Sequence, residues 1–313
     1  MASYVGHNER QRELEKLYNK LCHRYSRYEV WQDMVVMIAC AIANAVDKRY
    51  FDEREAMYMR VVQKYTKDEL AIFPEFFTHI VLGMEEHPDC DFLGELYMGL
   101  ELGNSHAGQF FTPYDICRMM AQVTINEDQL KGEIDRHGWI SVNDCASGAG
   151  ATLVAAANYL RSIGINYQMQ ALFVAQDVDM TVALMCYIQL SLLGCAGYVI
   201  VGNTLTEPQT GPVLFGEESS RCWYTPMYYH AVWDTRRAIA MTKSIFQRVA
   251  TAIPDETPEK PTANMSETGS AGNAKEEPTS APAPEPELEP VCVPTLTIST
   301  GKKNAGQIMF DFE

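Results

Sequence analysis

Apolar residues recur every three or four positions through most of the first hundred residues. The runs "LEKLYNKLCHRY", "WQDMVVMIACAIANAV" and "EAMYMRVVQKY" all show this spacing, which is typical of helices with one buried face. We therefore predict a helical N-terminal domain over residues 1–104.

The pattern changes near Gly138. Short β-rich runs ("WISVN", "ALFVA" and "YVIVG") alternate with the helical runs "GAGATLVAAANYLRSIG" and "MTVALMCYIQLSLLG". Strands and helices that alternate through short connections are typical of a parallel sheet covered by helices. We predict an α/β domain over residues 105–250.

Composition changes again after this domain. The chain has 313 residues and a formal net charge of −16, and Pro254–Pro294 is dominated by Pro, Glu, Ala, Ser and Thr. Such a segment cannot bury enough apolar area to offset its ordering entropy. We expect a disordered acidic linker over residues 251–300 and a C-terminal peptide over residues 301–313. The remaining chain is still acidic, which disfavours binding to a phosphate backbone without a partner.

Compartment and metal content are predicted from the same sequence. No apolar run approaches the roughly 20 residues that span a bilayer, and the charged N-terminus lacks the apolar region of a signal peptide. Nine cysteines lie singly, without a CxxC pair, which favours a reducing cytoplasm. His87 and Cys90 in "HPDC" have no second ligand pair, so we interpret them as a surface turn and predict no metal site.

A turn of small residues follows the first predicted strand. In "NDCASGAGATLVAA", Asp144 ends the strand, and Gly148 and Gly150 open a helix. Glycines let a ligand approach the backbone, and a helix N-terminus offers free N–H groups to an anion. Close packing between helix and strand also selects glycine, so the turn alone does not establish a ligand site.

Polar residues end the next two strands. Asp177 and Asp179 follow the second strand in "FVAQDVD". Asp177 is placed to accept hydrogen bonds from ribose hydroxyls, and Asp179 is expected to cap the following helix. Asn203 in "GNTL" follows the third strand, where either contact with an adenine edge or a solvated turn accounts for it.

Upstream, two aromatic residues precede a Thr-Pro pair in "AGQFFTPYDICRMMA". Helix initiation explains Thr112 as N-cap and Pro113 at the first helical position, but it does not explain "GQFF". Gly108–Pro113 matches the GxFFTP signature of the N6-adenine DNA methylases, the family of the modification subunits of type I restriction systems. Asp144–Gly150, "QDVD" and "GNTL" resemble that family's following motifs in the same order, and the resemblance covers about residues 8–250.

The resemblance implies a Rossmann-like class I methyltransferase domain that uses S-adenosylmethionine (SAM), behind the helical domain. By the family pattern, the cofactor-binding residues are Gln109, Phe110, Phe111, Thr112, Pro113, Tyr114, Asp144, Ala146, Ser147, Gly148, Gly150, Asp177 and Asn203. This chain departs from the pattern at Cys145, Ser147 and Asn203, where the family has Pro, Cys and Asp.

The family's catalytic motif, (N/D)-P-P-(F/Y), is absent. In "RCWYTPMYYHAVW", Thr225-Pro226-Met227-Tyr228 aligns as a degenerate version. Thr225, Pro226 and Tyr228 are therefore the catalytic candidates, with Tyr228 or Tyr229 available to stack on a flipped base. The alternative interpretation is that this aromatic cluster is apolar packing at the edge of the sheet.

The implied function is SAM-dependent methylation of adenine N6 in DNA. Because the catalytic motif is degenerate, the alternative is a catalytically silent SAM-binding partner or regulator, such as an anti-restriction protein or a modification-complex subunit. A third interpretation keeps the enzyme but makes RNA or protein its substrate. Between Phe246 and the predicted linker, no segment remains to build a target-recognition domain. We therefore expect sequence specificity to come from a specificity subunit or another protein partner, or from the helical N-terminal domain.

The C-terminal peptide suggests one more partner. Gln307–Phe312 in "GQIMFDFE" resembles the peptides that dock on sliding clamps. A short apolar anchor on a tether is an effective docking device, so we predict clamp binding through these residues.

Overall fold

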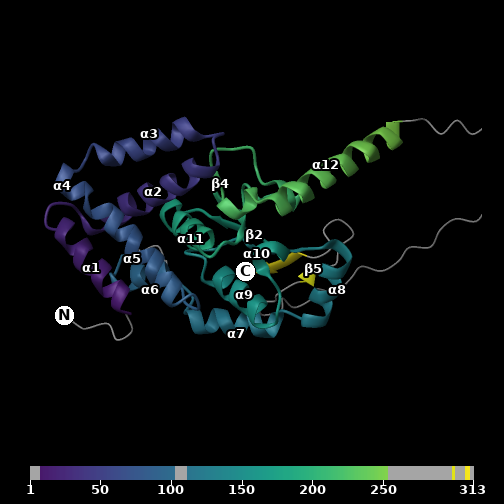
Figure 1. Ribbon diagram of the computed structural model, residues 1–313, viewed down its shortest axis with the longest axis horizontal. Helices are drawn as coiled ribbons and strands as arrows, with labels where there is room; N and C mark the ends of the chain where they lie inside the picture. Colours follow the sequence, from purple (N-terminus) through teal and green to yellow (C-terminus); the bar gives the residue numbers. More distant parts are fainter. Residues whose placement is uncertain (1–7, 103–110, 253–297, 300–306, 311–313) are drawn as a thin grey trace, which may run out of the picture. The chain divides into compact units, whose positions relative to one another are not determined.

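The computed structural model describes residues 8–102, 111–252, 298–299 and 307–310 (Figure 1). In residues 8–102, helices are the only regular secondary structure, as predicted from the periodicity of this segment. Their bounds are α1 Glu9–Leu21, α2 Arg27–Val46, α3 Phe51–Val62, α4 Lys67–Leu70, α5 Ile72–Glu86 and α6 Phe92–Gly99.

Polar caps set the starts of several of these helices. The Asn8 side chain accepts a hydrogen bond from the Gln11 N–H in a capping box, and the Ser26 side chain accepts one from the Glu29 N–H. Such caps satisfy amide donors that the first turn of a helix leaves unpaired. The helix boundaries are thus encoded locally.

Helix α2 is the buried centre of the helical part. It is long and apolar enough to cross a membrane by length and composition, but 61% of its most apolar window is buried inside the protein. Trp31 is fully buried, and its indole N–H donates to the Met185 sulfur at 3.4 Å. A buried position of this kind is typical of a core helix.

The α/β part begins with α7 and α8 and continues as alternating strands and helices. The helices are α7 Tyr114–Thr124, α8 Glu127–His137, α9 Ala151–Ser162, α10 Tyr167–Gln170, α11 Met180–Leu192 and α12 Ala231–Ala252, with the short 3-10 helices η2 Val213–Phe215 and η3 Pro226–Tyr229. The strands are β1 Ile140–Asp144, β2 Ala171–Asp177, β3 Ala196–Val201, β4 Cys222–Tyr224, β5 Ile298–Ser299 and β6 Gln307–Phe310.

The six strands form one sheet in the order β4-β3-β2-β1-β6-β5. Strands β1, β2 and β3 are parallel to one another, and β6 is parallel to β1, whereas β4 and β5 are antiparallel to their neighbours. The prediction of a parallel-rich α/β sheet behind a helical segment is confirmed. Almost every residue of β2 and β3 is buried, as expected where helices cover both faces of a parallel sheet.

Strands β5 and β6 lie in two segments for which the sequence predicted no strand. Ile298 and Ser299 lie in the predicted linker, most of which is outside the described residues, and Gln307–Phe310 lies in the predicted docking peptide. The structure places Gln307–Phe310 in the sheet beside β1. Residues 311 and 312 of the predicted clamp motif are outside the described ranges, so clamp binding remains a prediction.

Helix α12 passes from one compact unit, residues 1–238 and 294–313, into a second unit of residues 239–293. In the described part of the second unit, four apolar side chains of α12 are at least half exposed: Ile239, Met241, Ile245 and Phe246.

Candidate functional site

Because β1, β2 and β3 are parallel, their carboxyl ends meet at one edge of the sheet. We call this the carboxyl edge: it comprises Asp144–Gly150 after β1, Asp177–Asp179 after β2, and Gly202–Thr204 after β3. Ligands of open α/β sheets bind at such an edge.

The Asp144 side chain orders the first turn through hydrogen bonds. The residue is buried, and one carboxylate oxygen accepts a hydrogen bond from the Ala146 N–H at 3.1 Å. The other oxygen accepts a hydrogen bond from the Thr152 hydroxyl on α9. The structure therefore gives Asp144 a role in shaping the turn and joining it to α9, where the sequence pattern predicted cofactor contact.

Gly148 and Gly150 are glycines for different structural reasons. Both have left-handed backbones, with φ of +51° at Gly148 and +95° at Gly150. A Cβ at Gly150 would lie 2.8 Å from the Cys186 sulfur, so close packing against α11 requires this glycine. A Cβ at Gly148 would instead lie 3.4 Å from the ring of Phe111. Packing thus explains Gly150. The position that a Cβ would take at Gly148 is open as far as the ring of Phe111, and we call this space the cradle.

Asp177 is held by the backbone of two turns. One carboxylate oxygen accepts a hydrogen bond from the Gly148 N–H at 2.8 Å, and the other accepts one from the Asp179 N–H at 3.0 Å. Burial raises the pKa of the Asp177 carboxyl, and these amide donors oppose the rise. Each carboxylate oxygen can accept a second hydrogen bond, which suits a neighbouring pair of ribose hydroxyls.

Asp179 caps α11, as predicted. One of its carboxylate oxygens accepts hydrogen bonds from the Thr181 N–H at 2.7 Å and the Val182 N–H at 3.3 Å. This cap explains why a second acid follows Asp177 so closely.

The loop after β3 is tied to the first turn. The Asn203 side chain is exposed and accepts a hydrogen bond from the Leu205 N–H at 2.9 Å, as in the solvated-turn interpretation. The Thr204 hydroxyl donates to the carbonyl oxygen of Cys145 at 2.5 Å. Sequence reasoning did not identify Thr204 as the residue that joins the two turns.

Only part of the GxFFTP segment lies in the described residues, since Gln109 and Phe110 fall outside them. The Phe111 ring stacks on that of Tyr97, with centroids 5.5 Å apart and planes 25° from parallel. The N-cap of α7 is Pro113, without a side-chain hydrogen bond. The prediction of Thr112 as N-cap and Pro113 as first helical residue was wrong by one position, because the helix begins only at Tyr114.

Tyr114 is oriented toward neighbouring helices. Its hydroxyl donates to Asp89 at 2.8 Å and accepts a hydrogen bond from the Asn158 amide at 3.2 Å. These contacts tie the start of α7 to α9, and they involve no residue of the carboxyl edge.

A buried glutamine supports the turn from α11. Gln189 is fully buried, and its amide N–H₂ donates to Ala149 O at 2.9 Å and to Asp91 at 2.7 Å. Its carbonyl oxygen accepts a hydrogen bond from the Leu93 N–H at 3.1 Å. Sequence reasoning missed this residue, although a lone glutamine in an apolar helical run is a signal, because a buried amide needs partners.

The structure does not bring the predicted catalytic residues to the carboxyl edge. Strand β4 is antiparallel to β3, so Thr225 follows β4 at the amino end of β3, beside Gly197. Thr225 is fully buried. Pro226 opens η3, and the Tyr228 hydroxyl donates to Leu214 O at 2.9 Å. Strands β2 and β3 separate this corner from β1 and its turn.

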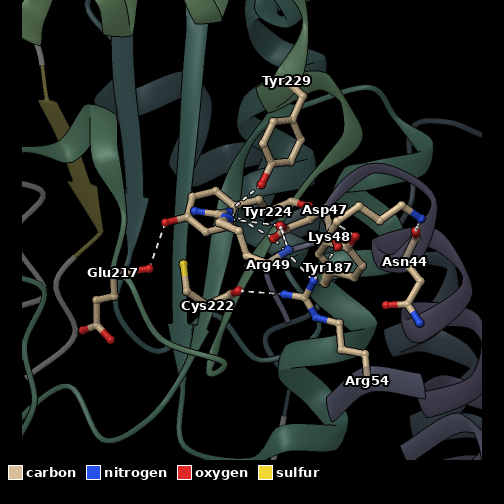
Figure 2. Close-up of polar contacts among 10 residues, drawn as sticks. All are labelled: Asn44, Asp47, Lys48, Arg49, Arg54, Tyr187, Glu217, Cys222, Tyr224 and Tyr229. Carbon is tan, nitrogen blue, oxygen red and sulfur yellow. Dashed lines mark hydrogen bonds and ion pairs between the residues drawn. The ribbon is translucent and has the colours of Figure 1, made fainter. Parts of the chain in front are cut away.

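The same corner holds β4 to the helical part (Figure 2). The buried Arg54 guanidinium lies 3.3 Å from the buried Asp47 carboxylate and donates to Cys222 O at 3.2 Å. The Arg49 guanidinium lies 4.3 Å from the ring centroid of Tyr224 and hydrogen-bonds the Tyr229 hydroxyl. Strand β4 and the aromatic residues of η3 thus form a packing surface for the turn between α2 and α3.

The carboxyl edge fits SAM better than it fits a metal. Gly148 provides a cradle beside an aromatic ring, and Asp177 provides spare acceptors at the end of β2. Across the residues that the structure describes, no three His, Cys, Asp or Glu side chains form a group able to hold a metal ion.

Comparison with known proteins adds the family. Residues 90–254 match the family model of the N-6 DNA methylases, whereas no curated protein matches the chain. Among solved structures, the chain is similar to a putative class I SAM-dependent methyltransferase from Listeria monocytogenes, with 17% identity, a TM-score of 0.35, and coverage of 66% of this chain and 58% of that one.

The chain is also similar to the methyltransferase subunit of a type I restriction-modification system from Streptococcus thermophilus. The identity is 14%, the TM-score is 0.35, and 65% of this chain and 60% of that chain are covered. This chain therefore spans about three fifths of each solved structure. The family model matches more than half of the 313 residues, and this protein belongs to the N-6 DNA methylase family.

Proposed function

We propose that this protein binds SAM at the carboxyl edge and takes part in methylating adenine N6 in DNA. Family membership implies SAM as the cofactor. The observation that carries the proposal is the carboxylate of Asp177, which two backbone amides hold at the end of β2. Fixed acceptors in this position suit the ribose of a nucleoside cofactor.

The other predicted cofactor-binding residues fall into two groups: those that would contact SAM and those that order the turn beneath it. Phe111 and Gly148 line the cradle in which we propose that the methionine end of SAM lies. By the family pattern, Gln109 and Phe110, which are outside the described residues, are also expected to contact it. Asp144 and Ser147 would act through the turn: Asp144 orders it, and the Ser147 N–H donates to Gln176 O at 3.0 Å. SAM supplies an electrophilic methyl group, and the protein's task is to orient it toward the nucleophile.

DNA recognition is expected to need a partner. A formal charge of −16 opposes binding to phosphates, since DNA affinity depends on cationic contacts. We propose that a specificity subunit or another protein supplies these contacts, and that the complex acts in the cytoplasm.

Calorimetry tests the cofactor site. Wild type should bind SAM, and Asp177→Ala should weaken binding by about 1–3 kcal/mol, because the ribose hydroxyls would lose their partly buried acceptors. Asp135→Ala, which removes an exposed acid on α8, is the matched control and should bind like wild type. If wild type shows no affinity at millimolar SAM, the proposal fails.

A second candidate function is a SAM-binding subunit without its own catalytic group. The observation that favours it is the position of Thr225, which is fully buried at the amino end of β3. Transfer of labelled methyl from SAM to unmethylated DNA separates the two candidates. Transfer by the chain, alone or with its DNA-recognising partner, supports the enzyme, whereas SAM binding without transfer in the presence of that partner supports the silent subunit.

A further inference from the structure

The edge of β1 that faces away from β2 is filled from the far end of the sequence. Strand β6 lies parallel to β1, in a register that pairs Ser141 with Gln307 and Asp144 with Phe310. The compact unit that contains β1 also contains residues 294–313. The C-terminal strand is therefore part of the same sheet as the candidate cofactor site.

Strand β1 has the character of an interior strand. Ile140, Ser141, Val142 and Asp144 are each at most 4% exposed. A strand buried on both faces needs hydrogen-bonding partners along both sides, because its amide and carbonyl groups cannot reach water. Strand β2 supplies these partners on one side of β1, and β6 supplies them on the other.

The pairing reaches the end of β1 from which the first turn begins. Phe310 is the register partner of Asp144. The Asp144 carboxylate, in turn, accepts hydrogen bonds from the Ala146 N–H and from Thr152 at the start of α9. Holding the backbone of Asp144 therefore steadies the turn that contains Gly148.

We propose that the edge of β1 is a strand-docking site, that its occupant is this chain's own segment Gln307–Phe310, and that docking and SAM binding strengthen each other. The coupling to SAM rests on the proposed function, whereas the docking does not. The covalent connection through residues 253–297 makes pairing intramolecular, which favours it over pairing with a separate molecule. Coupling between two bound elements is reciprocal, so SAM should also tighten the strand.

Hydrogen exchange on the full-length wild-type chain tests the docking and the coupling. The amides of residues 307–310 should exchange more slowly than those of an unstructured peptide, and saturating SAM should slow them further. Exchange at the rate of a free peptide would overturn the docking. Protection that does not change with SAM, in a chain that binds SAM, would overturn the coupling.

A proline substitution in the full-length chain tests the same coupling in the opposite direction, by disrupting the strand and measuring SAM binding. Ile308 lies between Val142 of β1 and Ile298 of β5, so Ile308→Pro removes an amide donor from the middle of paired strands. It should abolish the protection of the segment and weaken SAM binding about tenfold, the scale of typical coupling. Asn304→Pro, placed before the strand, is the matched control and should leave both unchanged.

The remaining outcomes are also decisive. Lost protection with unchanged SAM affinity in Ile308→Pro would overturn the coupling. Should this variant fail to fold, the response of wild-type exchange to SAM decides the coupling. Protection found only in a dimer on size-exclusion chromatography would mean that a second copy supplies the strand. Absence of SAM binding in wild type would defeat the proposed function, while the protection of residues 307–310 would still decide the docking.

Discussion

The Thr225 hydroxyl accepts a hydrogen bond from the Gly197 N–H at 3.0 Å and donates to the carbonyl oxygen of Cys195 at 2.7 Å. Both partners lie at the amino end of β3, about 13 Å along the strand from its carboxyl end at the usual rise per residue. Thr225 is therefore a structural link between β4 and β3 in this fold. A base held at the carboxyl edge would be out of its reach.

Thr225→Val should lower the free energy of unfolding by about 1–3 kcal/mol, because the buried Gly197 N–H loses its side-chain acceptor. SAM affinity should stay unchanged. Urea unfolding and calorimetry measure the two quantities. Thr235→Val is the control, since the Thr235 hydroxyl bonds to Ala231 O on an exposed face of α12. A Thr225→Val protein of normal stability that has lost methyl transfer would return Thr225 to the catalytic candidates.

Gly148→Ala should weaken SAM binding. A side chain at φ +51° costs about 1–2 kcal/mol in strain, and the added methyl group would fill the cradle beside Phe111. Calorimetry measures the loss of affinity.

Gly164→Ala is the control that separates backbone strain from steric obstruction of the SAM site. Gly164 also has a positive φ, +82°, but no atom lies within 4 Å of the position that its Cβ would take. This variant should lose stability and keep its SAM affinity. Equal affinity loss in both variants would show that the effect at Gly148 is general destabilisation.

Arg54→Met should be strongly destabilising. Arg54 and Asp47 form an ion pair in which both side chains are 2% exposed, and removing one partner of a buried pair costs about 3–5 kcal/mol. Arg49 still pairs with Asp47, so we expect the lower end of this range. Urea unfolding measures the change, with Arg60→Met on the exposed face of α3 as the control. A loss below 1 kcal/mol would mean that Arg49 alone compensates the Asp47 charge.

Asp91 should make stability depend on pH. Burial raises the pKa of its carboxyl, and hydrogen bonds from the Gln189 amide and the Gly94 N–H only partly oppose the rise. A carboxyl whose pKa is raised by folding stabilises the protein below its unfolded pKa of about 3.9. That contribution is lost as the pH rises through the folded pKa.

Asp91→Asn, which cannot ionise, should therefore gain stability relative to wild type between pH 4 and neutrality. Urea unfolding of Asp91→Asn and wild type at several pH values measures the difference. A difference that falls as the pH rises would mean that the hydrogen bonds outweigh burial and stabilise the ionised form.

The sequence by itself determined the elements and much of the carboxyl edge. Hydrophobic periodicity is a local property, so the helices and the three parallel strands could be read from spacing alone. Short crossover connections then place consecutive strands side by side and parallel. Asp177 and the glycine turn came together for this reason, and Asp179 caps its helix through neighbours two and three residues away.

Only the tertiary structure decided which edge of the sheet each later segment joins. Motif order suggested that Thr225 follows a strand at the active site, but β4 pairs antiparallel with β3 and carries Thr225 to the opposite edge. Nothing local in Gln307–Phe310 indicates that it pairs with β1, because strand pairing depends on partners distant in sequence. The roles of Gln189 and Thr204 also depended on the tertiary structure, because their hydrogen-bonding partners are distant in the sequence.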